Sequence, residues 1–508
     1  MKRFISLIIS VLMLCSLVPV SAFAEEVTEY TYEKFKYTIN DGEITIKQYT
    51  STTDTIATVP AKIEGMPVTV IGVSAFAYKT NLQKIILPDS ITRIEHRAFE
   101  ACSKLTELII PDKVTTLGIG LFEGCTALEF VYFGEGITSI PSSCFYNCSS
   151  FIGYISASPI TSIGDSAFRR CTALEYVYLD DGIETIPDYL FYECSSLIYV
   201  DMPDSIKVIG TEAFYKCSSL GTINLSDELT TIKSNAFCES GLTSVVIPAS
   251  VTSIGERAFA YCKRLDRYLF KGYVPYLTST FYLSTAIEYA IIPEGTTNID
   301  GCFWDCRSLK KAYIPTSIKE IYSSSFFGCS NLTDIYYAGT EEEWNEKLQP
   351  YGDFDEKVTI HFNAVPADVA DDYVAEVDGV EYIVPAKETI YLDIYEGLVI
   401  DNLCYVFVQW EIDYGNITFE DVTSAVQTIV MPAEDFCVRS VFRLVADLNG
   451  DEKVNARDKA ALTSLIKSDS FDEYADINLD GKVNARDKAA VAEIIKGNYD
   501  YAPYFEAE

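Results

Sequence analysis

The sequence predicts a multidomain chain built around a long β-solenoid, and three observations support that fold class. One apolar motif recurs twelve times at steps of 22 or 23 residues. A stretch of alternating strands without that period follows the repeats, and two Asp-rich loops, each with an amphipathic helical pattern behind it, close the chain. Regular periods of about 20–50 residues are typical of solenoids, in which each unit buries its apolar face against its neighbours.

Length and composition agree with several folded domains. A chain of 508 residues corresponds to three or four domains at about 150 residues each. With 48% hydrophobic and only 22% charged residues, global disorder is excluded. The formal net charge of -35 argues against nucleic acid or an anionic membrane as a partner.

The first 24 residues are typical of a cleaved secretory signal. Lys2 and Arg3 precede an apolar run from Phe4 to Val20, and Ala22-Phe23-Ala24 stands before Glu25. No later apolar run approaches the roughly 18 residues that a membrane-spanning helix needs. We therefore expect a secreted, extracellular protein that is released or attached noncovalently.

A Phe marks each repeat. A typical unit reads Ile163-Gly164-x-x-Ala167-Phe168-x-x-Cys171-x-x-Leu174-x-x-Val177-x-Leu179. Its Leu-x-x-Val-x-Leu part alternates like a short strand, and its Ala-Phe-x-x-Cys part is expected to turn on the opposite face. The repeat Phe residues are Phe76, Phe99, Phe122, Phe145, Phe168, Phe191, Phe214, Phe237, Phe259, Phe281, Phe303 and Phe326.

This motif resembles the BspA-like leucine-rich repeat family of type 5. The resemblance implies a leucine-rich-repeat β-solenoid with α/β-type repeats over residues 66–338, and a role in adhesion or in binding a protein or glycan. It also implies an N-terminal cap over 25–65 and a C-terminal cap over 339–362. In the second cap, a short helix is expected after Gly339 and a strand over Val358–Phe362.

Nine of the fourteen cysteines that follow the signal share one repeat position, three residues after the Phe. Stacked equivalents point the same way, which is a poor approach for a disulfide, whereas a buried thiol packs as a small hydrophobe. A disulfide ladder, or a zinc site at the pairs Cys144/Cys148 and Cys302/Cys306, is the alternative. We predict buried thiols at Cys102, Cys125, Cys148, Cys171, Cys194, Cys217, Cys262, Cys306 and Cys329.

The outward positions of the repeat strands are expected to form an exposed strand face. Aromatic side chains cluster there in the third to sixth units. Exposed aromatics on a rigid sheet are anchors for a protein partner or stacking platforms for sugar rings. The alternative is that Tyr simply favours strands. The candidate ligand face consists of Phe130, Tyr132, Tyr176, Tyr178 and Tyr199.

Residues 363–445 lack the repeat period and show alternating strands such as Glu381–Val384 and Thr389–Leu392. The segment resembles an internalin B-repeat-like β module. That resemblance implies a small β-sandwich-like spacer without chemistry of its own.

A twelve-residue loop occurs twice, as 447–458 and 476–487. Calcium prefers six to eight hard oxygen ligands, and each loop offers them at positions 1, 3, 5, 7, 9 and 12. Two Ca²⁺ ions are therefore predicted, with position 7 ligating through its backbone carbonyl; a solvated acidic turn is the alternative. The candidate ligands are Asp447, Asn449, Asp451, Lys453, Asn455, Asp458, Asp476, Asn478, Asp480, Lys482, Asn484 and Asp487.

A helix is predicted only after each loop, because Val441–Leu444 has the pattern of a strand end. Loop then helix, twice, with Asp at position 12, resembles the type I dockerin family over residues 446–497, followed by a tail over 498–508. The resemblance implies an all-α module of two loop-helix units that docks on a scaffoldin cohesin in cellulosome-like, polysaccharide-degrading complexes. The partner contacts that it implies are Ala456, Arg457, Lys459, Ala485, Arg486 and Lys488.

No enzymatic activity is expected. The chain has only two histidines, His96 at a variable repeat position and His361 in the strand of the C-terminal cap, so a Ser-His-Asp arrangement is improbable. The predicted domains also leave no block of about 200 residues for a catalytic barrel. Two alternatives stay open: a free secreted adhesin, which would bind no cohesin, and an unrecognised glycoside hydrolase subunit of the same complex.

Overall fold

The computed structural model describes residues 28–347, 357–366, 372–377, 380–385, 389–393, 397–400, 403–415, 417, 419, 426–430 and 435–444. The predicted signal and the predicted calcium-binding module lie outside these residues. The chain divides into two compact units with the boundary between Leu174 and Glu175, and each unit is described by itself.

The first unit opens with the N-terminal cap. Strands β1 (Tyr30–Tyr32), β2 (Phe35–Asn40) and β3 (Glu43–Tyr49) form an antiparallel meander. Strand β3 then pairs in parallel with β6 (Met66–Ile71), which continues the sheet into β8 (Arg93–Ile94) and β10 (Thr116–Leu117) of the repeats. The short β5 (Lys62–Ile63) pairs with β6. The cap therefore supplies the hydrogen-bonding edge on which the first repeats stack.

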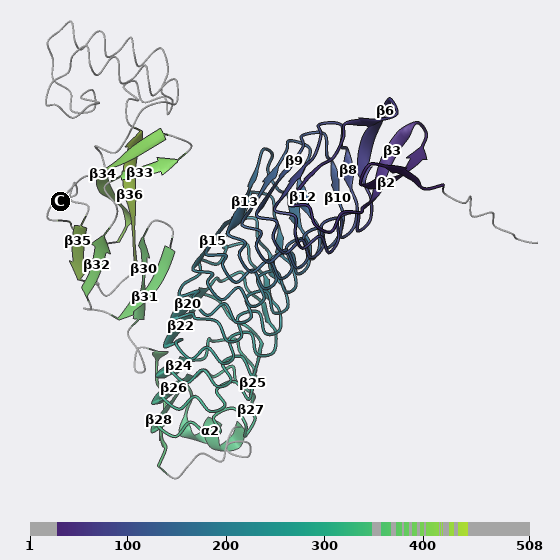
Figure 1. Cartoon of the computed structure of the whole chain (residues 1–508). Helices are drawn as coiled ribbons and strands as arrows, with labels where there is room; N and C mark the ends of the chain where they lie inside the picture. The colour runs from purple at the N-terminus through teal and green to yellow at the C-terminus, as the bar shows by residue number, and fades with distance from the viewer. Residues whose placement is uncertain are drawn as a thin grey trace, which may run out of the picture. The chain divides into compact units, whose positions relative to one another are not determined.

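Each repeat contributes short parallel strands that pair with their equivalents in neighbouring repeats (Figure 1). In the first unit these are β4 (Ile56–Thr58) with β7 (Lys84–Ile86), β9 (Glu107–Ile110) with β11 (Phe130–Phe133) and β13 (Gly153–Ser156), and β12 (Ser139–Ile140) with β14 (Ser162–Ile163). The register is strict, since Glu107, Phe130 and Gly153 align across three strands. Equivalent repeat positions therefore form continuous rows.

The second unit repeats this arrangement in five sheets. They are β15 (Tyr176–Tyr178) with β17 (Tyr199–Asp201); β16 (Thr185–Ile186), β18 (Val208–Ile209), β19 (Thr231–Ile232) and β21 (Ser253–Ile254); β20 (Ser244–Ile247) with β22 (Arg267–Phe270); β23 (Tyr276–Thr278), β25 (Asn298–Asp300) and β27 (Glu320–Ile321); and β24 (Tyr289–Ile291), β26 (Lys311–Ile314), β28 (Asp334–Tyr337) and β29 (Thr359–His361).

The segment opposite the strands is built from turns, so the expected α/β-type repeat is wrong for the described repeats. In the repeats from Phe76 to Phe303, the residues two places before and two places after the Phe have a left-handed backbone. Around Phe145 they are Ser143 and Asn147, with φ of 55° and 61°. Such residues cannot continue a right-handed helix. Their repeat is bonded to its neighbour instead, because the Phe145 N–H donates to the Ala167 carbonyl at 2.8 Å.

The repeat Phe rings form the centre of the core. Neighbouring rings from Phe99 to Phe122 and from Phe122 to Phe145 lie 5.5 Å apart between centroids, and the ring planes are nearly parallel. These side chains are fully buried. Burying one such ring contributes about 1.5–3 kcal/mol, so the row supplies a large share of the stability of each unit.

Tyr49 of the N-terminal cap takes the place of a repeat Phe. Its ring stacks on Phe76 at 5.4 Å. Its N–H donates to the Ala75 carbonyl at 2.7 Å, as the Phe76 N–H does to Ala98 at 2.8 Å. The cap therefore ends the core row with an aromatic ring of its own.

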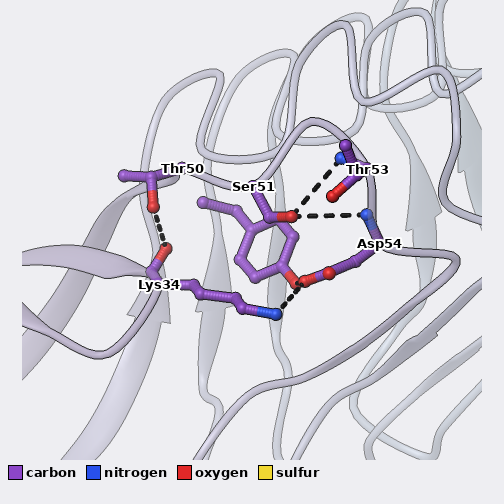
Figure 2. A network of polar contacts seen from close by, with 6 residues as sticks. Lys34, Thr50, Ser51, Thr53 and Asp54 are labelled. Atoms are coloured by element: carbon purple, nitrogen blue, oxygen red, sulfur yellow. Dashed lines mark hydrogen bonds and ion pairs between the residues drawn. The ribbon is translucent and has the colours of Figure 1, made fainter.

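The hydroxyl of this Tyr requires a polar partner, which Asp54 provides. The Tyr49 hydroxyl donates to the Asp54 carboxylate, and the Lys34 ammonium lies 2.6 Å from the same oxygen. Figure 2 shows how the surrounding loop is held: the Ser51 hydroxyl accepts from the backbone N–H groups of Thr53 and Asp54. The hydrogen bonds that the Asp54 carboxylate accepts, first from Lys34 and then from Tyr49, hold its pKa at about 2.

The C-terminal cap follows the last repeat. Helix α2 (Glu341–Lys347) begins with a capping box, because the Glu343 N–H donates to Thr340 Oγ1 at 3.2 Å and the Thr340 N–H donates to Glu343 Oε2 at 3.0 Å. Trp344 of this helix is buried and packs edge-on against Tyr337 at 5.3 Å. The helix thus covers the apolar end of the last repeat.

The residues beyond the cap form a β module, shown green in Figure 1. Its strands are β30 (Asp372–Val377), β31 (Val380–Pro385), β32 (Thr389–Asp393), β33 (Gly397–Ile400), β34 (Leu403–Tyr414), β35 (Val426–Val430) and β36 (Phe436–Leu444). One sheet has the order β31-β30-β36-β34-β33, and β32 pairs with β35. The described residues of this module therefore form two sheets, and its role as a spacer stays a prediction.

Candidate functional site

The strand face of the first unit carries several exposed apolar side chains. Strand β11 carries Phe130, which is half-buried, and Tyr132, which is 36% exposed, with 6.3 Å between their ring centroids. Tyr132 aligns with Ile109, which is 65% exposed, on the neighbouring strand. Ile86 of β7 is also exposed. The exposed apolar positions of this face therefore include isoleucines beside the predicted aromatics.

The strand face of the second unit brings three predicted residues together. Tyr176 and Tyr178 on β15 are 51% and 67% exposed, and Tyr176 aligns with the half-buried Tyr199 on β17. The rings of Tyr178 and Tyr199 lie 6.2 Å apart at a tilt of 58°. Asp201 aligns with Tyr178, so a carboxylate borders the aromatic cluster.

Exposure does not hold along the whole strand face, contrary to expectation. Val246 is 4% exposed and packs against Leu269, its register partner on the next strand. Tyr313 is 7% exposed, with Ile291 and Tyr336 aligned with it on the strands to either side. Large apolar side chains in adjacent register cover these positions.

The cysteines form a buried ladder, as predicted, and the structure adds a role for their thiols. The nine repeat cysteines are between 0% and 8% exposed, and none of the nine forms a disulfide. Cys148 Sγ donates to the Phe122 carbonyl at 3.1 Å, and burial raises the pKa of the Cys262 thiol to about 12. Among the described residues, no group of three or more His, Cys, Asp or Glu side chains is arranged to hold a metal ion.

Both histidines have structural contacts. His96 Nδ1 accepts from the Ile119 N–H at 2.9 Å. His361 Nε2 lies 2.7 Å from Asp334 Oδ1, and its ring stacks on Tyr336 at 4.5 Å. The hydrogen bond from His361 lowers the pKa of Asp334 below its ordinary value.

Sequence reasoning missed a row of aromatics on the turn face, at the position that directly follows each repeat Phe. In the second unit this row includes Tyr192, Tyr215, Tyr282, Trp304 and Phe327. The signal is visible in the sequence as a repeated Phe-aromatic dipeptide.

The predicted calcium ligands and cohesin contacts lie outside the described residues. They are Asp447, Asn449, Asp451, Lys453, Asn455, Asp458, Asp476, Asn478, Asp480, Lys482, Asn484 and Asp487 for calcium, and Ala456, Arg457, Lys459, Ala485, Arg486 and Lys488 for the partner. In the part of the chain that is described, no helix has the length and apolar character needed to cross a bilayer.

The regular coils, the Phe row and the strand pairing define a leucine-rich-repeat solenoid. The family model described as "BspA type Leucine rich repeat region" matches in six copies over residues 63–158, 138–266 and 278–348, which is more than half of the chain. The protein belongs to this family. A second family model, "Dockerin type I domain", matches residues 445–496.

Both families are noncatalytic kinds of domain, and proteins that carry them are typically extracellular. Type I dockerins generally bind calcium and dock on a cohesin partner. No curated protein matches the chain.

Similar solved structures are bacterial leucine-rich repeat proteins. A leucine rich cell surface protein from Faecalibacterium prausnitzii A2-165 is 25% identical, with 63% of this chain and 97% of that chain covered and a TM-score of 0.37. A leucine-rich repeat protein from Bacteroides ovatus ATCC 8483 is 21% identical, with 66% and 99% covered and a TM-score of 0.46. The pneumococcal vaccine antigen PcpA is 16% identical, with 67% and 99% covered and a TM-score of 0.36.

Proposed function

We propose that this protein is a secreted, noncatalytic component of a cohesin-dockerin, cellulosome-like complex that degrades polysaccharides. Its C-terminal module docks on a scaffoldin cohesin in a calcium-dependent manner, and its solenoid binds a protein or glycan. The observation that carries the proposal is the duplicated calcium loop inside the segment matched by the type I dockerin model, residues 445–496.

The residues of each loop fit a calcium ion by their chemistry. Every proposed ligand offers oxygen: three carboxylates, two Asn amides and one backbone carbonyl per loop. Calcium takes such hard oxygen ligands in sets of six to eight. Bound calcium would fold the two loop-helix units and set the partner residues on their first turns.

The solenoid supplies the second part of the proposal. Tyr176 and Tyr178 are more than half exposed on a sheet whose register is fixed by backbone pairing. Rigid aromatic side chains bind a partner at a low cost in conformational entropy, which makes them common anchors at interfaces. A protein that binds a ligand through its solenoid and docks on a cohesin through its C-terminal module would hold that ligand beside the enzymes of the complex.

The test is a calorimetric titration of the full secreted chain into a panel of type I cohesins, with calcium and with a chelator. We expect tight binding in calcium and none in chelator, and we expect the Asp458→Ala, Asp487→Ala double variant to lose it. The Asp469→Ala, Asp472→Ala variant is the matched control, because it removes two carboxylates from the segment between the loops. If the protein binds calcium but no cohesin, the docking proposal fails, and a free secreted adhesin becomes the better hypothesis.

A further inference from the structure

The aromatic row on the turn face of the second unit is interrupted. Tyr192 and Tyr215 stack at 4.8 Å with 18° between their planes. Further along, Trp304 lies 5.9 Å from Tyr282 and 4.5 Å from Phe327. Between these two stacks, the equivalent positions of two successive repeats hold Cys238 and Ala260, whose small side chains are buried. Two consecutive rings are therefore missing from the row.

A hollow of about 390 Å³ lies at this interruption, with Cys238 in its lining. Tyr215 from the preceding repeat and Tyr261 from the following repeat contribute aromatic surface to it. Its volume is near the lower end of the roughly 300–1,000 Å³ that small-ligand sites occupy. The full lining consists of Tyr192, Glu212, Tyr215, Asn235, Cys238, Glu239, Arg257 and Tyr261.

Two polar side chains of the lining are held in place by neighbours. The Tyr215 hydroxyl donates to Glu239 Oε1 at 2.8 Å, and Lys216 Nζ lies 3.9 Å from the same oxygen. The Arg257 guanidinium lies over the Tyr282 ring at 5.6 Å. These contacts orient a carboxylate and a set of N–H donors without help from a ligand.

Two other polar side chains of the lining remain available. Among the described residues, none is hydrogen-bonded to the side chain of Glu212 or Asn235. Glu212 offers only acceptors, whereas the Asn235 amide offers both donors and acceptors. The hollow thus combines ring surface with acceptors and donors on several sides.

This chemistry favours a neutral sugar over a charged ligand. An anion would meet Glu212 and Glu239, and a cation would meet Arg257. A pyranose ring presents an apolar C–H face to an aromatic ring and hydroxyls that both donate and accept at its edge. Planar carboxylate, amide and guanidinium groups can bind such hydroxyls in pairs.

We propose that this hollow is a carbohydrate-binding site for a neutral, pyranose-based polysaccharide, with the sugar ring occupying the gap in the aromatic row. The inference rests on the binding role proposed for the solenoid and assigns the glycan to the turn face, so that the aromatic strand face is left for a protein partner. It does not depend on cohesin docking.

The test is affinity electrophoresis of the full secreted chain in native gels that contain hydroxyethylcellulose, xyloglucan, arabinoxylan, galactomannan or soluble starch, with polygalacturonate as the acidic polymer. We expect at least one neutral polymer to retard the protein. Cys238→Tyr would fill the gap with the side chain found at the equivalent position in two preceding repeats, and Tyr261→Ala would remove one wall. Each should weaken retardation at least about tenfold, the loss typical of blocking or truncating an anchoring aromatic.

The matched control is Tyr276→Ala, which removes an exposed tyrosine outside the hollow and should be retarded like the wild type. Thermal unfolding of each variant verifies its fold, and cohesin titration of the same samples reports the docking proposal separately. The carbohydrate proposal is overturned if no neutral polymer retards the chain or if only polygalacturonate does. It is also overturned if a Tyr176→Ala, Tyr178→Ala variant of the strand face loses retardation while Cys238→Tyr and Tyr261→Ala keep it.

Discussion

The thiol of Cys148 donates a hydrogen bond to the carbonyl oxygen of Phe122, 26 residues earlier, at 3.1 Å. The same bond recurs at 3.0–3.2 Å from Cys102, Cys125, Cys171, Cys217, Cys262, Cys306 and Cys329. Ser replaces the Cys at two repeats. Ser284 Oγ donates to the Phe259 carbonyl at 2.7 Å, and Ser240 Oγ lies 3.4 Å from Cys262 Sγ. This repeat position therefore favours a small side chain that can donate a hydrogen bond to a backbone carbonyl. Its burial in an apolar core alone does not explain that preference.

Substitution of Cys148 should separate these two requirements. Cys148→Ala loses both volume and the donor, and we expect it to lower the free energy of unfolding by about 1–2 kcal/mol. Cys148→Ser keeps the donor and should cost about 0.5–1 kcal/mol less than Ala. Urea denaturation of both variants measures the difference. An Ala variant as stable as the Ser variant would show that the hydrogen bond contributes nothing.

Gly210 should resist replacement because the neighbouring repeat is too close. A Cβ there would lie 2.6 Å from the backbone nitrogen of Asp188. We expect Gly210→Ala to cost about 1–3 kcal/mol, since backbone must move to admit it. Gly221→Ala is the control, because a Cβ at Gly221 would meet nothing within 4 Å. Its stability should stay within about 0.5 kcal/mol of the wild type; equal losses in both variants would contradict the packing argument.

The stability that Asp54 contributes should depend on pH in the acid range. Its pKa is lowered from 3.8 to about 2 in the folded protein, so the folded state binds fewer protons there than the unfolded state. The contribution is therefore present above the ordinary value and lost as the pH falls toward 2. Asp54→Asn should be less stable than the wild type at neutral pH, and the gap should close between pH 3.8 and about 2. Denaturation curves of the wild type and the variant across this range measure it, and a gap that stays constant down to about pH 2 would contradict it.

The internal duplication of the C-terminal module predicts two ways of docking. Both halves carry Ala-Arg-Asp-Lys after the ninth loop position, at 456–459 and 485–488. Arg457→Ala and Arg486→Ala should each retain cohesin binding, because the other helix can take over, whereas the double variant should lose it. Calorimetry with one cohesin suffices. Loss of binding in a single variant would show that only that half docks.

The two calcium loops should differ in affinity. Position 6 favours a positive φ, and loop 1 has Glu452 there while loop 2 has Gly481. Glu452→Gly should tighten the weaker of two binding steps in a calcium titration of the full chain and leave the other unchanged. Gly481→Glu should weaken the tighter step. Two equal steps in the wild type would contradict this assignment.

The sequence predicts most of the solenoid because its signal is repeated. The Phe, Cys and Leu positions recur so often that the repeat pattern alone predicts their burial. Phe145 and Cys148 could therefore be assigned to the core from the sequence. The absence of a helix in the repeat was not foreseen. It depends on left-handed residues such as Ser143 and Asn147, and these positions have no strict residue preference that a pattern search would detect.

The candidate ligand surfaces were predicted less completely. Tyr176 and Tyr178 are exposed as their alternation indicates, but Tyr313 occupies an equivalent position and is buried, since its exposure depends on neighbours 22 and 23 residues away. The hollow at Cys238 could not be predicted from that residue. It arises from what the adjacent repeats place around a small side chain, which only the stacked register reveals.

Hydrogen bonds from each turn to the next repeat, such as that from Phe145 to Ala167, give every repeat the same donors on one side and the same acceptors on the other. A duplicated or deleted repeat would therefore leave matching surfaces at the junction. Gene duplication can lengthen such a protein in whole steps of about 4.8 Å, the spacing of paired strands, without alteration of either cap. The number of repeats therefore sets the length of the solenoid, and so the size of the surface that it can offer to a ligand.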